Sequence, residues 1–529
     1  MRRIGIDVGG TNTDAVLIEE GKVARAVKAP TSEDVTGGIL QSLARLRDAG
    51  AVTNERIANR RIANQRIEGV MIGTTHFINA VVQRRHLTKV AALRLGMPAS
   101  ASLPPFCDWP ADLARIVQGG VWMVEGGHDY DGRVFMPLDE AAVREAARAM
   151  KAAGLTAVAI SSIFSPLDPG HERRAAEIVA EENPGSVVTC SSDLGRIGLL
   201  ERENAGLLNA ALADLARDTI AAFERAIGDS GIDAKLFITQ NDGTVVEAAQ
   251  AMRLPVYSFA SGATNSMRGA AYLSGLGDAM VADVGGTTTD VGQLRHGFPR
   301  EANSVVEVGG VRTAFRMPDL MSFGLGGGSH VALDPLKIGP PKIGPLSVGY
   351  RLLQDGIAFG GRQLTTTDVA VAAGVLALGD RANVAHLGAD LCRRVFAEAR
   401  RMVEETIDRM KTEAGDVPLI AVGGGAFLVP DKIDGVSQVI RVRHGDCANA
   451  VGAAIAQVSG EVDQIFRDLP RGDAVAAAQR IAADRAVSAG ADRDTLKTIE
   501  TEDMPIAYLP GNALRVRVRM VGDVAGGRS

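Results

Sequence analysis

One eight-residue pattern occurs twice in this chain and constrains its fold more than any other feature. The pattern D-V-G-G-T-x-T-D runs from Asp7 to Asp14 and again from Asp283 to Asp290. Each copy lies between two apolar stretches, which predicts a strand, a tight turn and a second strand. A single copy could be a chance hairpin, because Gly-Gly is a common hairpin signal. Two copies, each opening a region of alternating strands and helices, indicate duplication around one cleft.

The turn inside each copy has the chemistry of a phosphate-binding loop. Its glycines let backbone N–H groups converge on an anion without side-chain obstruction, and its threonines and asparagine add donors. We predict that the following residues hold phosphates: Gly9, Gly10, Thr11, Asn12, Thr13, Gly285, Gly286, Thr287, Thr288 and Thr289. The alternative is a pair of hairpins in which glycine and asparagine only satisfy turn geometry.

An aspartate stands near the end of the first predicted strand of each copy. A carboxylate there can hold Mg²⁺, usually through water, or orient an attacking group. We therefore predict that Asp7 and Asp283 are the catalytic and magnesium-binding residues. Two such loops facing each other would clamp the β- and γ-phosphates of a nucleotide from both sides.

A third glycine-rich turn supports a nucleotide site. The run Gly423, Gly424 and Gly425 directly follows a predicted strand over Leu419–Val422. Such a turn could lie against an adenosine. The alternative is a strand-to-helix turn that is tightly packed for structural reasons.

The order of predicted elements indicates an α/β chain of several domains, as expected for 529 residues. We predict an N-terminal lobe over 1–198 and a C-terminal lobe over 199–460, joined by a long helix at 199–228. The strand at 235–239 is assigned to the second lobe. Residues 461–529 are predicted to form a helical and β-strand extension.

Composition excludes several classes of function. The net charge is −6 and only 4% of residues are aromatic, which argues against a nucleic-acid partner. The longer apolar runs, such as Thr156–Ile163, are too short to cross a bilayer. The first residues reach Asp7 without the apolar core of a signal peptide. We therefore expect a cytoplasmic protein with no membrane partner.

Taken together, these motifs resemble those of the hydantoinase A/5-oxoprolinase family within the actin and hexokinase superfamily of ATPases. Besides the three glycine turns, the resemblance rests on G-T-T-H-F-I-N-A-V at Gly73–Val81, E-R-E-N at Glu201–Asn204, Q-N-D-G-T at Gln240–Thr244, Ser261-Gly262, and F-G-L-G-G-G-S at Phe323–Ser329. It implies two ribonuclease H-like lobes around an ATP cleft, with inserted segments and Mg²⁺ as a cofactor. The chain departs from the family pattern at Ile72 and at 261–266, which leaves the substrate less defined than the nucleotide.

The resemblance also implies a function. In this family an A-type subunit uses ATP to phosphorylate the oxygen of a cyclic amide, such as a hydantoin or 5-oxoproline. A B-type partner then completes the reaction, in a homo- or hetero-oligomer. A small-molecule kinase and a nucleotide-gated activator or interaction ATPase of the same superfamily remain alternatives.

Two segments are candidates for contacts with the cyclic amide substrate. They contribute Thr74, Thr75, His76, Asn79, Gly326, Gly327 and Gly328. His76 and Asn79 could equally belong to a turn that caps a helix. We favour a cleft role for the glycine loop, because a run of small residues is entropically costly unless close approach is needed.

Overall fold

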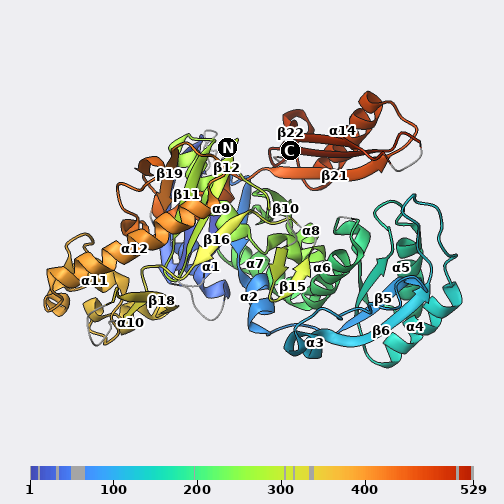
Figure 1. Ribbon diagram of the computed structural model, residues 1–529, viewed down its shortest axis with the longest axis horizontal. Coiled ribbons are helices and arrows are strands. Elements are labelled where there is room, and N and C mark those ends of the chain that lie inside the picture. The colour runs from blue at the N-terminus through green and yellow to red at the C-terminus, as the bar shows by residue number, and fades with distance from the viewer. Residues whose placement is uncertain are drawn as a thin grey trace.

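The computed structural model describes residues 2–9, 12–30, 35–48, 66–195, 197–302, 306–313, 316–332, 339–507 and 511–525. Over these ranges the chain is built on two large mixed β-sheets. A separate four-stranded sheet lies at one end of the molecule (Figure 1). The α/β prediction is therefore confirmed.

Within the first large sheet, the strands from the N-terminal part of the chain, together with β9, have the order β3-β2-β1-β4-β9. Its strands are β1 (Arg2–Val8), β2 (Asn12–Glu19), β3 (Lys22–Pro30), β4 (Gly69–Thr74) and β9 (Lys235–Thr239). The first three are antiparallel neighbours, whereas β1, β4 and β9 run parallel. Strand β1 is buried along nearly all its length, as expected for a central strand covered on both faces. Helix α1 (Val35–Asp48) packs on β2 and β3.

The second sheet repeats this topology. Its order is β13-β12-β11-β19-β20, with β16 also paired to β12. Its strands are β11 (Ala279–Val284), β12 (Thr289–Arg295), β13 (Phe298–Pro299), β16 (Leu320–Phe323), β19 (Val417–Val422) and β20 (Val436–Arg441). Again the first strands are antiparallel and β11, β19 and β20 are parallel. If the five strands of each order are numbered along the chain, both sheets have the order 3-2-1-4-5. This shared order confirms two ribonuclease H-like lobes.

The inserted sheet is entirely parallel, with the order β6-β5-β7-β8. Its strands are β5 (Val90–Met97), β6 (Gln118–Glu125), β7 (Ala157–Ser162) and β8 (Val187–Cys190). Helices α4 (Glu140–Ala152) and α5 (Gly170–Glu182) share a buried apolar cluster with these strands.

The structure differs from the predicted lobe division in two places. The stretch 199–228 is two helices, α6 (Leu199–Ala211) and α7 (Ala213–Asp229), which are separated at Leu212. Helix α6 packs on the inserted sheet, whereas α7 packs on α1. The strand at 235–239 is β9, which pairs with β4 in the first sheet and not with the second lobe. The apolar pattern continues across Leu212, so periodicity alone does not locate the break.

The C-terminal extension contains both helix and strand, as predicted, and it lengthens the first sheet. Strands β21 (Val458–Phe466), β23 (Leu514–Gly522) and β22 (Lys497–Pro505) follow β10 (Val245–Glu247) in the sheet order. Helix α14 (Arg471–Ser488) covers them with buried alanines spaced four residues apart. Arginines of β23 form ion pairs with the body of the protein; Arg517 lies 2.7 Å from Glu301.

No helix within the described ranges combines the length and apolar character of a membrane span.

Two helices cross between the large sheets. Helix α9 (Ser261–Ser274) and helix α13 (Ala448–Ile455) contact each other more extensively than any other pair of helices. A side chain at Gly269 would place its Cβ 1.8 Å from the carbonyl oxygen of Ala448, and one at Gly452 would place it 1.8 Å from that of Asn265. The crossing therefore requires glycine at both positions.

We predict that Gly452→Ala destabilises the protein by at least about 2 kcal/mol, since backbone atoms of α9 would have to move. Thermal or urea unfolding measures the change. The matched control is Gly228→Ala in α7, where no atom lies within 4 Å of the added methyl group. That variant should be stabilised by up to roughly 1 kcal/mol, because alanine favours helix. Equal stability of the two variants would contradict the tight crossing.

Candidate functional site: two equivalent loops beside buried carboxylates

The first glycine turn joins β1 to β2. The Gly9 amide donates to the carbonyl oxygen of Asn12 over 3.1 Å, which closes the turn. Asp7 lies opposite Asp14 across the strand pair, one position before the turn. Gly10 and Thr11, also predicted to hold phosphate, lie outside the described residues.

The second turn has the same construction. The Gly285 amide donates to the carbonyl oxygen of Thr288 over 2.9 Å, and Asp283 lies opposite Asp290. Thr288 is exposed and Thr287 is half-buried, so both lie where a ligand can reach them. The repeat in the sequence is thus a repeat in backbone geometry.

The last threonine of each copy does not face the carboxylates. Thr13 and Thr289 pair with Val8 and Val284, one position along from the aspartates, and successive strand residues point to opposite faces. Both threonines are fully buried. The Thr289 hydroxyl donates to the carbonyl oxygen of Leu325 over 2.7 Å. Only the backbone of these residues is therefore placed to contribute to a phosphate site.

Four aspartates gather between the turns, with little compensating charge. Burial, then repulsion from Asp14 and Asp283, raises the pKa of Asp7 to about 8. Burial, then repulsion from Asp290, raises the pKa of Asp283 to about 6. The pKa values of Asp14 and Asp290 are also raised, chiefly by burial. These mutual effects mean that the carboxyls of the two copies lie within electrostatic reach of each other.

Lys28 on β3 is the cation that acts on both Asp7 and Asp283. Its Nζ donates to Asp14 Oδ2 over 3.0 Å. Two carboxylate oxygens, Asp7 Oδ1 and Asp14 Oδ1, are buried and accept no hydrogen bond from any described residue.

This arrangement fits a divalent cation. Buried carboxylate oxygens without partners are costly, and a bound cation would compensate for both their charge and their lost hydration. Within the described ranges, no three His, Cys, Asp or Glu side chains are close enough to enclose a metal directly. A cation held here through water molecules is consistent with both observations.

The third glycine turn packs directly on the second glycine turn. Gly423 has a φ of +85°, and a Cβ there would lie 2.4 Å from Asp283 Oδ1. The Gly425 amide donates to the carbonyl oxygen of Val284 over 2.7 Å. Gly424 has no atom within 4 Å on its Cβ side. One end of the turn therefore lies against Asp283, and Gly424 borders open space on its Cβ side.

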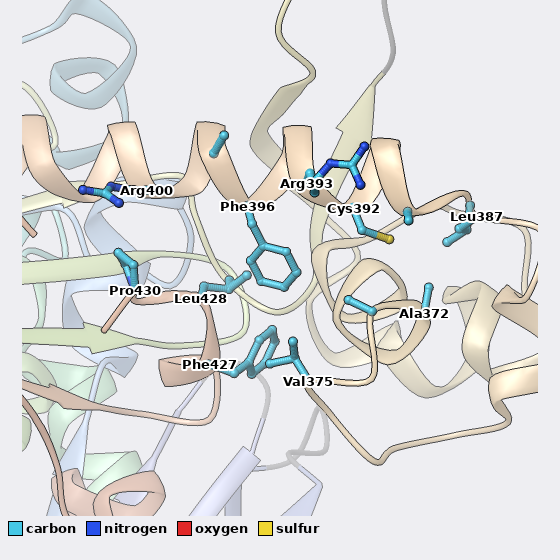
Figure 2. Close-up of a pocket in the computed structure, with 13 residues that line it drawn as sticks. Ala372, Val375, Leu387, Cys392, Arg393, Phe396, Arg400, Phe427, Leu428 and Pro430 are labelled. Atoms are coloured by element: carbon cyan, nitrogen blue, oxygen red, sulfur yellow. The ribbon is translucent and has the colours of Figure 1, made fainter. Parts of the chain in front are cut away.

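A cavity of about 650 Å³ lies next to this turn. Figure 2 shows Phe396 pointing from α12 (Ala389–Met410) toward Phe427 and Val375. Arg393 and Arg400, also on α12, are the charged residues that line it. The cavity is therefore mostly apolar with two cations at its edge, which suits a planar aromatic group attached to an anionic chain.

The predicted glycine loop, 326–328, packs on the second glycine turn. Gly327 and Gly328 donate their amides to the carbonyl oxygens of Gly285 and Gly286, over 3.0 and 2.7 Å. A Cβ at Gly326 would lie 2.6 Å from the Thr287 nitrogen. Close approach therefore explains these glycines, but all three of their amide donors are already used within the protein, since the Gly326 amide donates to Ser329 Oγ over 2.8 Å.

The segment Thr74–Asn79 lies beside the first carboxylates, since Gly73 pairs with Asp7. The Thr74 hydroxyl accepts from the His76 amide, and the Thr75 hydroxyl accepts from Asn79 Nδ2. His76 is half-buried, and burial lowers its pKa. These bonds lie at the start of α2 (His76–Gln83), although its N-cap residue, Thr75, makes no side-chain capping bond to the backbone.

Sequence reasoning missed several residues that the fold brings to this site: Lys28, Ser266, Phe427 and Asn449. Asn449 had a weak signal, as the single amide within the small-residue helix that begins at Ala448. Lys28 and Phe427 carried no pattern, because their roles depend on neighbours distant in sequence.

Comparison with known proteins adds to this geometry. Residues 3–183 match the hydantoinase/oxoprolinase N-terminal region, and residues 202–380 match the hydantoinase/oxoprolinase domain. The chain is 28% identical over 404 residues to the caprolactamase α subunit of Pseudomonas jessenii, covering 71% of this chain and 55% of that one. It is also 28% identical over 404 residues to the acetophenone carboxylase γ subunit of Aromatoleum aromaticum, covering 70% and 53%. The chain thus spans about half the length of these curated relatives.

A solved structure shares the fold. The crystal structure of ATP-dependent caprolactamase from Pseudomonas jessenii superimposes with a TM-score of 0.76 and 21% identity, covering 98% of this chain and 87% of that chain. Together, the two family matches extend over most of the sequence and include both glycine turns, the segment Thr74–Asn79 and the loop 326–328. The chain therefore belongs to the hydantoinase/oxoprolinase family.

Proposed function

We propose that this chain is the ATP-binding, A-type subunit of an ATP-dependent cyclic amide hydrolase. The observation that carries the proposal is the pair of equivalent turns, each beside an aspartate with a raised pKa. A site with converging amides and uncompensated carboxylates suits a nucleotide phosphate chain with its metal ion. The relative named as an ATP-dependent caprolactamase supports the same nucleotide.

ATP would lie across the second lobe. Gly285, Gly286, Thr287 and Thr288 would hold its phosphates, together with Gly9 and Asn12 of the first turn. The turn at 423–425 would pass along the ribose. The adenine would occupy the cavity between Phe427 and α12, where Phe396 and Arg393 also lie.

Mg²⁺ would be held through water by Asp7 and Asp283, and when bound it would neutralise charge on the phosphates. The carboxylates would also face the position of the terminal phosphate, where they would orient the attacking oxygen. The glycine loop at 326–328 would keep the second turn rigid through its two backbone hydrogen bonds to Gly285 and Gly286. Thr74, Thr75, His76 and Asn79 would lie on the substrate side, next to Asp7.

Phosphorylation explains why a cyclic amide needs ATP. A resonance-stabilised lactam is a poor electrophile, and phosphorylating its oxygen makes the ring carbon far more reactive. An O–P bond forms to the amide oxygen while the bond from the γ-phosphorus to the β–γ bridging oxygen breaks, and ADP leaves. This transfer needs positioning and charge neutralisation more than a covalent nucleophile. A B-type partner subunit would supply the ring opening, in keeping with relatives named as subunits.

ATP hydrolysis with a panel of lactams, with and without any co-purifying subunit, tests this function. We expect a hydantoin, 5-oxoproline or caprolactam to stimulate phosphate release. Asp7→Asn and Asp283→Asn should each lower the rate at least about 100-fold, because they remove charge without changing shape. Asp229→Asn, at an exposed position in α7, is the control. Wild-type turnover in both site variants would contradict the cleft, and stimulation by an alcohol alone would indicate a kinase.

The raised pKa values of Asp7, about 8, and Asp283, about 6, predict that Mg²⁺ binding depends on pH. Below these values each carboxyl carries a proton that the cation must displace. Affinity should therefore fall as pH is lowered from 8 to 6, by up to about tenfold per pH unit for each proton released. Calorimetry with ADP present measures affinity and proton release together. An affinity that does not change with pH, or an unchanged pH dependence in Asp7→Asn, would contradict this assignment.

The cavity assignment predicts a separate effect on the base. Phe427→Ala should weaken ATP binding roughly tenfold, because stacking on an aromatic ring contributes about 1–3 kcal/mol per base. Binding of inorganic tripolyphosphate, which has no base, should be unchanged. Equal losses of affinity for ATP and tripolyphosphate would mean that Phe427 contributes to folding and does not recognise the base.

A further inference from the structure

Asp7 is held by an amide side chain from the other end of the chain. Asn449 Nδ2 donates to Asp7 Oδ2 over 2.6 Å. Asn449 Oδ1 accepts from the Ala450 amide over 2.9 Å, so turning the side-chain amide over would lose both bonds. The orientation of the donor toward Asp7 is therefore fixed, while the other oxygen of Asp7, Oδ1, is buried and accepts no hydrogen bond from any described residue.

Asn449 reaches Asp7 from a helix that follows the second sheet in sequence. Helix α13 comes directly after β20, yet it packs on β1, β2 and β4 of the first sheet. A Cβ at Gly5 would lie 2.1 Å from the carbonyl oxygen of Ala450, which shows how closely α13 approaches β1. The aspartate of the first copy is thus fixed by the second half of the chain.

Asp283, the equivalent aspartate in the second copy, has a partner from a helix that follows the first sheet in sequence. Ser266, on α9 and almost fully buried, lies close enough to Asp283 for hydrogen bonding by its side chain to lower the pKa of that carboxyl, against the larger opposite effect of burial. Helix α9 follows β9 and β10 of the first sheet, yet it packs on β11 and β19 of the second. The two helices meet at Gly269 and Gly452. Each half of the chain therefore sends one helix across to the carboxylate of the other half.

We infer that Asn449 is a positioning residue for Asp7, with Ser266 as its counterpart for Asp283, so that the two crossing helices set both carboxylates for phosphoryl transfer. This inference rests on the proposed function. A carboxylate that is free to rotate loses the geometry that the transfer needs, although the nucleotide can still bind. A residue that only capped α13 would instead affect stability and leave the rate of the folded protein unchanged.

Steady-state ATP hydrolysis and calorimetric ATP binding separate these two roles. Asn449→Ala should lower kcat at least about tenfold and leave the ATP dissociation constant within about twofold, since it removes orientation and not binding. Asn449→Asp keeps the shape and the bond from Ala450 but puts a like charge against Asp7, so kcat should fall further. Ser266→Ala should show the same split. Asn383→Ala, at an exposed position of the 3-10 helix Arg381–Val384, is the control.

A second measurement does not depend on turnover. The double variant Asp7→Asn/Asn449→Asp exchanges the two side chains, so that an amide and a carboxylate are again in contact. Its melting temperature should recover most of the loss seen in Asn449→Asp alone, while ATP hydrolysis should stay low because position 7 lacks its carboxylate.

These results separate two kinds of failure. If the wild-type protein hydrolyses no ATP, the proposed function fails, and the melting temperatures still test the contact. The inference is overturned if the two substitutions act additively on melting temperature. It is also overturned if the Asn449 variants lower kcat no more than Asn383→Ala does.

Discussion

The pairing of aspartates at equivalent strand ends is the constraint on which the rest of this structure depends. Asp7 and Asp283 lie near the ends of β1 and β11, each opposite a second aspartate. Without a cation, their mutual repulsion and burial favour the protonated state, as their raised pKa values indicate. A protein keeps such groups buried only when the surrounding fold holds them firmly. Here that fold is a duplicated sheet, with a crossing helix from each half reaching the other.

The extensions around this core leave that arrangement intact. The inserted sheet of β5–β8 lies at one end of the molecule, and the strands β21–β23 add to the far edge of the first sheet (Figure 1). Neither interrupts the strands that carry the glycine turns. The segment between β12 and β19 supplies α12 and the loop 326–328, so the second lobe contributes both the cavity and the support of its glycine turn.

Much of this was predictable because the decisive information is local. A repeated D-V-G-G-T-x-T-D pattern specifies strand, turn and carboxylate together, and the structure has both turns with the same closing hydrogen bond. The strand register also determines that Thr13 and Thr289 point away from the aspartates, since side chains alternate along a strand. The prediction that both side chains bind phosphate is therefore at odds with the strand register.

The remainder depends on contacts between residues far apart in the chain. Asn449 meets Asp7 only because α13 crosses to the first sheet, and β9 joins that sheet although more than 150 residues separate it from β4. Phe427 lines a cavity only because α12 forms another wall of that cavity. No local pattern encodes these pairings, so a single sequence does not reveal them.

The central claim is that the two turns clamp one nucleotide, and a crystal structure with a non-hydrolysable ATP analogue and Mg²⁺ tests it most directly. The account predicts that the terminal phosphates and the cation lie between Asp7 and Asp283, with the base in the cavity beside Phe427. A nucleotide bound elsewhere, or one that contacts only one of the two turns, would contradict it.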